Sequence, residues 1–243
     1  GEQLFGFNSF GWRFSSVVFG SLLVLMTIRL ARRLSRSTMV GAIAGILLTL
    51  DGLAFVMSRI GLLDIFQAFF LVAGVSAVAA NRDWFRHRLA DHLRTIGNPH
   101  LDADFGPALG WRPWRLVAGI MFGLACGTKW NSMFVLATMG IVSVIWDWSA
   151  RRLAGAGTKA WWSFLRDGVP AFVYLVVVAL LTYLATWAKW LVTYPHMVFG
   201  KSWAGPAPSP GLSKVVGKPL AALWEYHRQI YDFHTGSYMM TQT

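Results

Sequence analysis

The sequence predicts an all-α protein that crosses a membrane several times. Of its 243 residues, 55% are hydrophobic and only 14% are charged, and the mean hydropathy is +0.48. Several apolar stretches approach or reach the roughly 20 residues that a helix needs to cross the hydrocarbon core of a bilayer. Most of the arginines flank these stretches, as expected for membrane helices. These observations favour a polytopic membrane protein over a soluble domain.

Six apolar stretches are candidate spans, and the fourth is short enough to be tilted or re-entrant. Their approximate bounds are Phe14–Leu30, Thr38–Met57, Ile60–Ala80, Pro113–Gly127, Asn131–Trp148 and Val169–Leu191. Residues 1–191 are therefore predicted to form a partial transmembrane domain. Residues 192–243 are predicted to be an external loop with a surface helix at Leu220–Tyr231. The segment Trp84–Ile96 has apolar residues at helical spacing among Arg and His, which predicts an amphipathic helix on the headgroups.

The basic residues predict an orientation. The net charge is +11, and fourteen of the 22 Lys and Arg residues lie on alternate connections between the six spans. Positive loops face the cytoplasm, so the short turns after the second and fourth spans, and the tail, face outward. No basic stripe or base-stacking motif is present, so nucleic-acid binding is not expected. The fourteen residues are Arg29, Arg32, Arg33, Arg36, Arg82, Arg86, Arg88, Arg94, Arg112, Arg115, Arg151, Arg152, Lys159 and Arg166.

Five charged residues are predicted to gather near the outer face. Charges in apolar spans are costly, and they usually face a polar cavity or a partner. Arg suits phosphate through its forked donors, and Lys supplies a compact charge. We therefore expect a site for an anionic headgroup such as a lipid phosphate; the alternative is a set of ion pairs, Asp51 or Asp64 with Arg59, that only orders the helices. The five are Arg13, Asp51, Arg59, Asp64 and Lys129.

Other polar residues give weaker signals. His227 and His234 lie in the tail near Glu225 and Asp232, but their spacing matches no metal motif, so no metal site is predicted. The single cysteine, Cys126, lies in an apolar run and is expected to be a small packing residue. The chain starts without Met and stops after a polar stretch, so we expect it to be a piece of a longer protein.

Several motifs in this order resemble the protein O-mannosyltransferases, membrane enzymes of the GT-C glycosyltransferase class. The resemblance covers nearly the whole chain, and the composition is similar to that of actinobacterial members. The motifs are Gly11-Trp12-Arg13, Leu50-Asp51-Gly52-Leu53, Ser58-Arg59-Ile60-Gly61-Leu62-Leu63-Asp64, Gly123-Leu-Ala-Cys-Gly-Thr-Lys129-Trp130-Asn131 and the tail around His227 and His234.

The resemblance implies a GT-C-like fold and transfer of mannose from a polyprenyl-phosphate carrier to Ser or Thr of proteins outside the cell membrane. It implies no other cofactor. Membrane lipids and secreted acceptor proteins would be partners, with the secretion machinery a further candidate. The family's catalytic Asp-Glu pair is expected upstream of Gly1, so no catalytic residue is assigned and this chain alone should be inactive. Arg13 and Lys129 match positions expected to contact the carrier phosphate, whereas the roles of Asp51, Arg59 and Asp64 stay open.

Two rival functions are compatible with the sequence. Another GT-C enzyme that moves a lipid-linked sugar to a different acceptor, such as a lipid, would use the same cations. A transporter would use Asp51 and Asp64 to bind protons or ions, but no inverted repeat supports this interpretation. The chemical nature of the acceptor separates the first rival from protein mannosylation.

Overall fold

The structure is a computed structural model that describes residues 2–194 and 208–236, all of them in helices or connecting turns and loops. The chain divides into two compact units, Gly1–Leu184 and Ala185–Thr243. The sequence predicts a division at residue 191, a few residues later.

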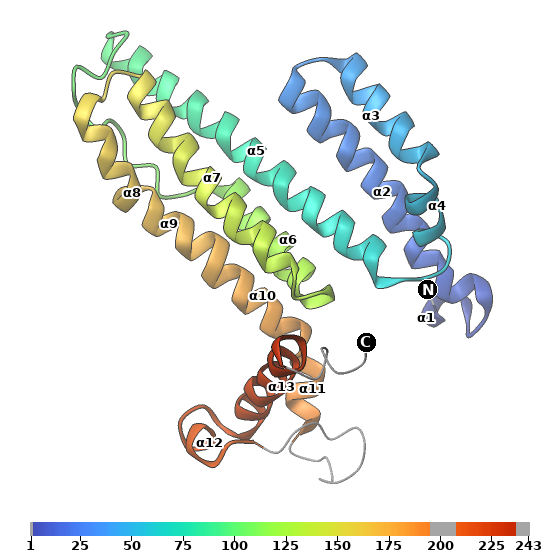
Figure 1. Cartoon of the computed structure of the whole chain (residues 1–243). Coiled ribbons are helices and arrows are strands. Elements are labelled where there is room, and N and C mark those ends of the chain that lie inside the picture. The colour runs from blue at the N-terminus through green and yellow to red at the C-terminus, as the bar shows by residue number, and fades with distance from the viewer. Residues whose placement is uncertain (1, 195–207, 237–243) are drawn as a thin grey trace. The chain divides into compact units, whose positions relative to one another are not determined.

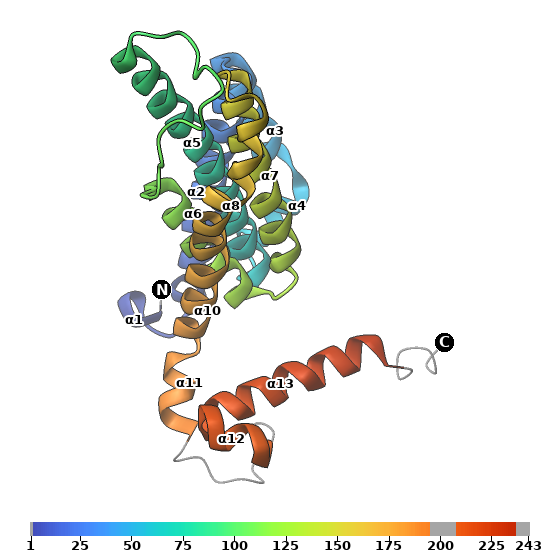
Figure 2. The same cartoon turned by 90° about the vertical axis from the view of Figure 1, so that its left-hand side faces the viewer.

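The first unit is a bundle of long helices. Figures 1 and 2 both show α2, α5, α6 and α7 running side by side along a common direction. Helix α5 packs against α2, α6 and α7, and it is therefore the central helix of this unit. The elements are α1 (Glu2–Phe5), α2 (Ser9–Ser35), α3 (Thr38–Leu50), α4 (Gly52–Met57), α5 (Leu63–Ile96), α6 (Pro113–Thr128), α7 (Ser132–Leu153), η1 (Gly157–Trp162), α8 (Ser163–Arg166), α9 (Gly168–Phe172), the π-helical η2 (Val173–Val177) and α10 (Val178–Thr186), of which the first unit includes residues 178–184.

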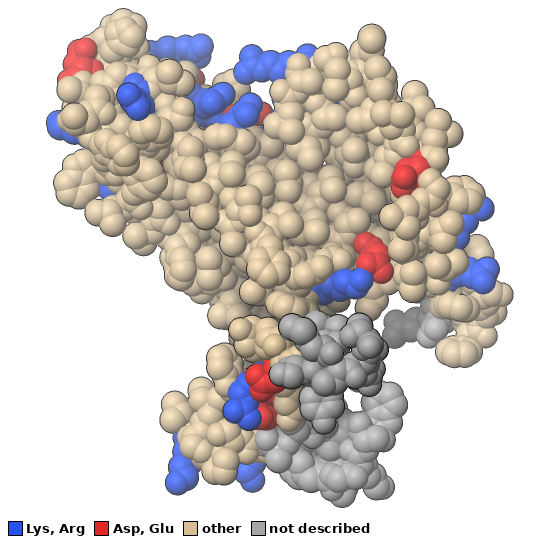
Figure 3. Space-filling view, in the orientation of Figure 1, with Lys and Arg blue, Asp and Glu red and all other residues tan. Residues whose placement is uncertain are grey.

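Membrane-spanning character is clear in four places within the described residues. The helical stretches Ser9–Ser35, Leu63–Ile96, Ser132–Leu153 and Gly157–Thr186 are long and apolar enough to cross a bilayer, and Thr38–Leu50 is a shorter apolar helix. The all-α membrane fold is thus confirmed, whereas the count of six spans stays a prediction. On the face drawn in Figure 3, Lys and Arg gather at the upper end of this unit, above a broad band of uncharged side chains.

The expected second span, Thr38–Met57, is not one continuous helix. Helix α3 ends at Leu50, and Asp51 then begins the short helix α4. The Asp51 side chain accepts a hydrogen bond from the backbone N–H of Ala54 at 2.7 Å, which makes it the N-cap of α4. Asp at this position favours a new helix start over continuation because its carboxylate competes for backbone donors.

The expected surface helix Trp84–Ile96 is instead the far end of α5. Helix α5 has 34 residues, so at 1.5 Å per residue it is about 51 Å long and exceeds the roughly 30 Å hydrocarbon core. Phe85 and Leu89 are buried in a cluster with Leu101, Ala150 and Ala156. The prediction that this face lies on the headgroups was wrong, because the following loop and the end of α7 cover it.

The second unit is small and helical. Its described elements are α11 (Ala188–Thr193), α12 (Pro210–Val216) and α13 (Lys218–Thr235), and α13 packs against both α11 and α12. Helix α13 contains the segment Leu220–Tyr231 and buries Ala221, Ala222 and Leu223. The side chain of His234 lies outside the described residues.

Candidate functional site

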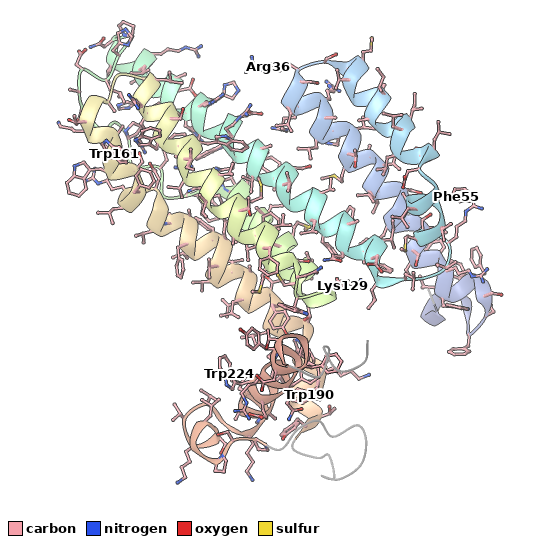
Figure 4. All side chains as sticks on the ribbon, in the orientation of Figure 1. Arg36, Phe55, Lys129, Trp161, Trp190 and Trp224 are labelled. Carbon is pink, nitrogen blue, oxygen red and sulfur yellow. The ribbon has the colours of Figure 1, made fainter. Side chains whose placement is uncertain are left out.

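Asp64 and Lys129 form the centre of the predicted site. Asp64 lies in the first turn of α5, and Lys129 is the C-cap residue of α6. Figure 4 labels Lys129 at the end of the bundle opposite Arg36 and Trp161. The Lys129 Nζ atom donates to Asp64 Oδ1, and the two side chains are 42% and 39% exposed. The pair is therefore both formed and accessible, so it can receive a further anion.

The connection that carries Lys129 is fastened to α5. The backbone N–H of Lys129 donates to Ala125 O at 2.9 Å, and Ser132 N–H donates to Lys129 O at 3.1 Å. From α5, Gln67 Nε2 donates to Asn131 Oδ1 at 2.7 Å and to Ser132 Oγ at 2.8 Å. Residues 129–132 thus form a short turn that is attached to α5 through the hydrogen bonds of Gln67 to Asn131 and Ser132.

Arg13 lies on α2, which packs against α5, and Arg59 lies in the turn between α4 and α5. The Arg59 guanidinium stacks over the Phe55 ring, 3.6 Å from its centroid, and Arg13 lies 5.5 Å from the centroid of the Trp12 ring. Gly61, with φ +72°, turns the chain into α5 beside Trp12, where a Cβ on Gly61 would be 3.5 Å from the Trp12 ring. The start of α2 therefore abuts the α4–α5 turn.

The alternative pairing of Asp51 or Asp64 with Arg59 is not observed. Asp64 pairs with Lys129, and Asp51 uses a carboxylate oxygen to cap α4. Within residues 2–194 and 208–236, neither Arg13 nor Arg59 forms an ion pair with a carboxylate. Two cations at this end of the unit are thus left for an external anion.

A substitution at Asp51 separates capping from substrate binding. Asp51→Ala removes the cap of α4 and should destabilise the protein by about 1 kcal/mol, whereas Asp51→Asn should not, because Asn caps equally well. Thermal unfolding of the purified protein measures the difference. If Asp51→Asn destabilises as much as Asp51→Ala, the carboxylate charge matters and capping is not the main role.

A second polar cluster, which the sequence does not predict, is buried at the other end of α6 and α7. Arg112 donates to Asp147 at 3.1 Å and to Asp167 at 2.9 Å, and Arg115 donates to Asp147 at 2.6 Å. Arg151 donates twice to Asp167, at 2.8 and 3.0 Å. All three arginines are fully buried. We call these five residues the buried arginine cluster.

The buried arginine cluster joins parts of the chain that are distant in sequence. Arg151 also donates to the backbone oxygens of Phe105 and Pro107, so it holds the loop between α5 and α6. Arg115 donates to the hydroxyl of Ser143 at 2.8 Å. No polar side-chain atom of the five is both buried and unpaired in the described structure. This saturation indicates a structural role rather than a substrate site.

The sequence predicts these arginines only as positive flanks of spans. Arg112 is the N-cap of α6, Arg115 lies in the first turn of α6 and Arg151 lies in the last turn of α7, and all three are buried instead of solvated. The available signal was the presence of Asp147 inside the fifth apolar stretch and Asp167 just before the sixth. A carboxylate in an apolar stretch needs a partner, and arginines were the nearest candidates.

An apolar groove runs along α7 beside the helical stretch from α8 to η2. Its volume is about 600 Å³, and it begins at Met133, close in sequence to Lys129. Leu136, Ile141, Phe172 and Val176 are among the residues that line it. Such a lining suits a hydrocarbon chain and offers little to a polar ligand.

The tail residues form an aromatic cluster within the second unit. The Trp187 ring contacts those of Trp190 and Tyr226 at centroid distances of 5.7 and 5.5 Å. His227 Nδ1 lies 2.6 Å from Leu223 O. Among the described residues, no group of three His, Cys, Asp or Glu side chains could hold a metal ion.

Comparison with known proteins gives a consistent result along almost the whole chain. The chain is 38% identical over 238 residues to a polyprenol-phosphate-mannose–protein mannosyltransferase of Mycobacterium tuberculosis (strain CDC 1551 / Oshkosh), covering 97% of this chain and 44% of that protein. Proteins with the same name in Mycolicibacterium smegmatis (strain MKD8) and Corynebacterium glutamicum are 36% and 34% identical, over 97% and 96% of this chain and 45% of each relative. No solved structure matches significantly.

The chain thus spans less than half the length of the curated relatives it matches. A family profile described as dolichyl-phosphate-mannose-protein mannosyltransferase matches residues 1–197. The match includes every element of the first unit and all five residues of the predicted site. The chain belongs to the dolichyl-phosphate-mannose-protein mannosyltransferase family.

Proposed function

We propose that the protein containing this chain transfers mannose from polyprenyl-phosphate mannose to Ser or Thr hydroxyls of proteins, at the outer face of the cell membrane. The observation that carries the proposal is the family match over residues 1–197, together with relatives whose names state this donor and a protein acceptor. The exposed Asp64–Lys129 pair at one end of an apolar bundle supports it, because a lipid phosphate needs a cation near the membrane surface.

In this proposal, Lys129 and Arg13 bind the carrier phosphate. The Lys129 ammonium has three N–H donors, of which Asp64 orients one, so the others can meet phosphate oxygens. Arg13 offers a guanidinium fork with no carboxylate partner among the described residues. Asp51 shapes the neighbouring turn by capping α4, and Arg59 on its Phe55 support adds positive potential.

The cations would help the reaction because the phosphate gains charge. The sugar carbon–oxygen bond to phosphate breaks, a new bond forms from that carbon to the Ser or Thr oxygen, and the hydroxyl proton passes to a base. The phosphate changes from a singly charged diester to a monoester with up to two charges. Cations therefore stabilise the transition state more than the bound donor, which is the condition for catalysis.

The carrier tail would lie in the apolar groove on α7. The groove begins four residues after Lys129, and its lining is nearly free of polar groups. A phosphate at Lys129 would place the first isoprene units at that opening. The rest of the enzyme, including the proton acceptor, is expected from parts of the protein outside this chain.

Lys129→Met tests the proposal in the full-length protein. We expect kcat/KM for the lipid donor to fall by about 10²-fold, the usual effect of losing one donor to a developing negative charge. Transfer of radiolabelled mannose from polyprenyl-phosphate mannose to a Ser/Thr-rich peptide in membranes measures it.

Lys159→Met is the matched control, because Lys159 is also exposed and pairs with a carboxylate, Asp104, at 3.5 Å. It should retain the parent rate. An unchanged rate in Lys129→Met would contradict the assigned role of Lys129. Label appearing in lipid instead of peptide would favour a GT-C enzyme with a different acceptor.

A further inference from the structure

Gln67 is the polar residue of α5 that follows Asp64 by three positions. Residues three apart in a helix lie on the same face, so Asp64 and Gln67 both contact the turn at residues 129–132. Asp64 holds the side chain of Lys129, whereas Gln67 holds the two residues Asn131 and Ser132. Helix α5 thus contacts this turn both at the Lys129 side chain and at the residues that set its backbone path.

Each hydrogen bond of Gln67 has a defined direction. The Ser132 hydroxyl has one proton, and it donates that proton to the carbonyl oxygen of Ala125 at 3.2 Å. It must therefore accept from Gln67, whose amide nitrogen carries two N–H groups. The second N–H goes to the Asn131 side-chain oxygen. Both donors are used, so a side chain without N–H groups cannot replace Gln67.

The position of the turn determines where Lys129 points. Lys129 is the C-cap of α6 and has extended backbone angles, so the helix ends at it and does not hold the residues that follow. Its long side chain has high rotamer freedom. Holding Asn131 and the buried Ser132 against α5 restricts the backbone on the carboxyl side of Lys129, and Asp64 restricts its ammonium group.

We propose that Gln67 is a positioning residue that acts on the lipid phosphate through Lys129, by fastening the α6–α7 turn to α5. The inference rests on the proposed role of Lys129. Gln67 does not touch the phosphate in this arrangement; it sets the place from which Lys129 does. Loss of Gln67 should therefore lower kcat/KM for the lipid donor only while Lys129 is present.

The test is a double-mutant cycle in the full-length protein. Gln67→Met has nearly the same volume without donors, and it should lower kcat/KM for polyprenyl-phosphate mannose by about tenfold, as expected for two lost hydrogen bonds of ordinary strength. Gln67→Glu keeps the shape and also lacks both N–H groups, so it should lose activity too. A role in packing alone would leave Gln67→Glu near the parent.

The decisive variant is the double variant that combines Gln67→Met with Lys129→Met. Because Gln67 acts through Lys129, the double variant should match Lys129→Met within about twofold. Gln229→Met, at an exposed position on α13, is the control for removing a glutamine amide and should leave the rate unchanged. Thermal unfolding of each purified variant accompanies the kinetics, so that a general loss of stability is visible.

A tenfold loss in both backgrounds, or no loss in Gln67→Met while Lys129→Met is impaired, overturns the positioning role and leaves the proposed function standing. An unimpaired Lys129→Met overturns the phosphate role of Lys129 and the inference with it. A tenfold loss that vanishes in the Lys129→Met background supports the proposal.

Discussion

Asp167→Ala should destabilise the first unit by about 3–5 kcal/mol, the cost of removing one partner from a buried ion pair. Asp167 accepts from Arg112 and twice from Arg151, and all three side chains are buried. The buried arginine cluster holds three cations and two carboxylates, so the substitution raises its formal charge from +1 to +2. Both arginines are fully buried, so neither can reach water without a rearrangement of the structure around it.

The yield of monodisperse protein after detergent extraction and its thermal midpoint measure the effect. Asp91→Ala is the control, because Asp91 forms a comparable carboxylate pair with Arg94 at 3.3 Å but is 61% exposed; such pairs contribute well under about 1 kcal/mol. A combined Arg151→Met and Asp167→Leu change should cost less than Asp167→Ala, since it removes charge of both signs. Equal stability of Asp167→Ala and the parent would contradict a structural role for the cluster.

Gly119→Ala should also damage the first unit, although it adds a single methyl group. Gly119 and Gly123 lie one turn apart on α6 and let α6 approach the chain from η2 to α10 closely. A Cβ on Gly119 would overlap the carbonyl oxygen of Tyr174, and one on Gly123 would lie 2.5 Å from that of Ala179. Backbone atoms cannot rotate away, so the helices must separate.

We expect a loss of about 1–3 kcal/mol, as for an overpacked core, measured as a lower thermal midpoint. Gly140→Ala on α7 is the matched control because a Cβ there meets no atom within 4 Å. Ala is favoured over Gly inside a helix, so this control should be neutral or slightly stabilising. A similar response of both variants would show that the contact between α6 and η2 does not depend on close approach.

Much of the architecture was predictable because hydropathy and charge are local properties. The all-α membrane fold follows from apolar stretches and flanking arginines, and most long helices overlap the expected stretches. The break after Leu50 was missed because Asp51 was interpreted as a charge within a span, not as the cap of a new helix. The extent of α5 was missed because its last turns are covered by a loop whose path the sequence does not indicate.

The candidate site was predictable as a group of residues but not as a set of contacts. The sequence placed Arg13, Asp51, Arg59, Asp64 and Lys129 toward one side, yet the choice of Lys129 over Arg59 as partner of Asp64 depends on how α5 and α6 are rotated about their axes. Gln67 carried no signal at all, because an amide in an apolar stretch has no preferred partner until the helices pack.

The class of the protein, its apolar helices and its family motifs follow directly from the sequence, since each depends on residues that are neighbours in the chain. The ion pairs follow only from the packing of the helices: Asp64 pairs with Lys129, 65 positions away, and Arg112 pairs with Asp167, 55 positions away. The physical reason is that an ion pair forms only when its charged atoms lie within about 4 Å of each other. The sequence specifies only the helix face and the depth at which a residue lies.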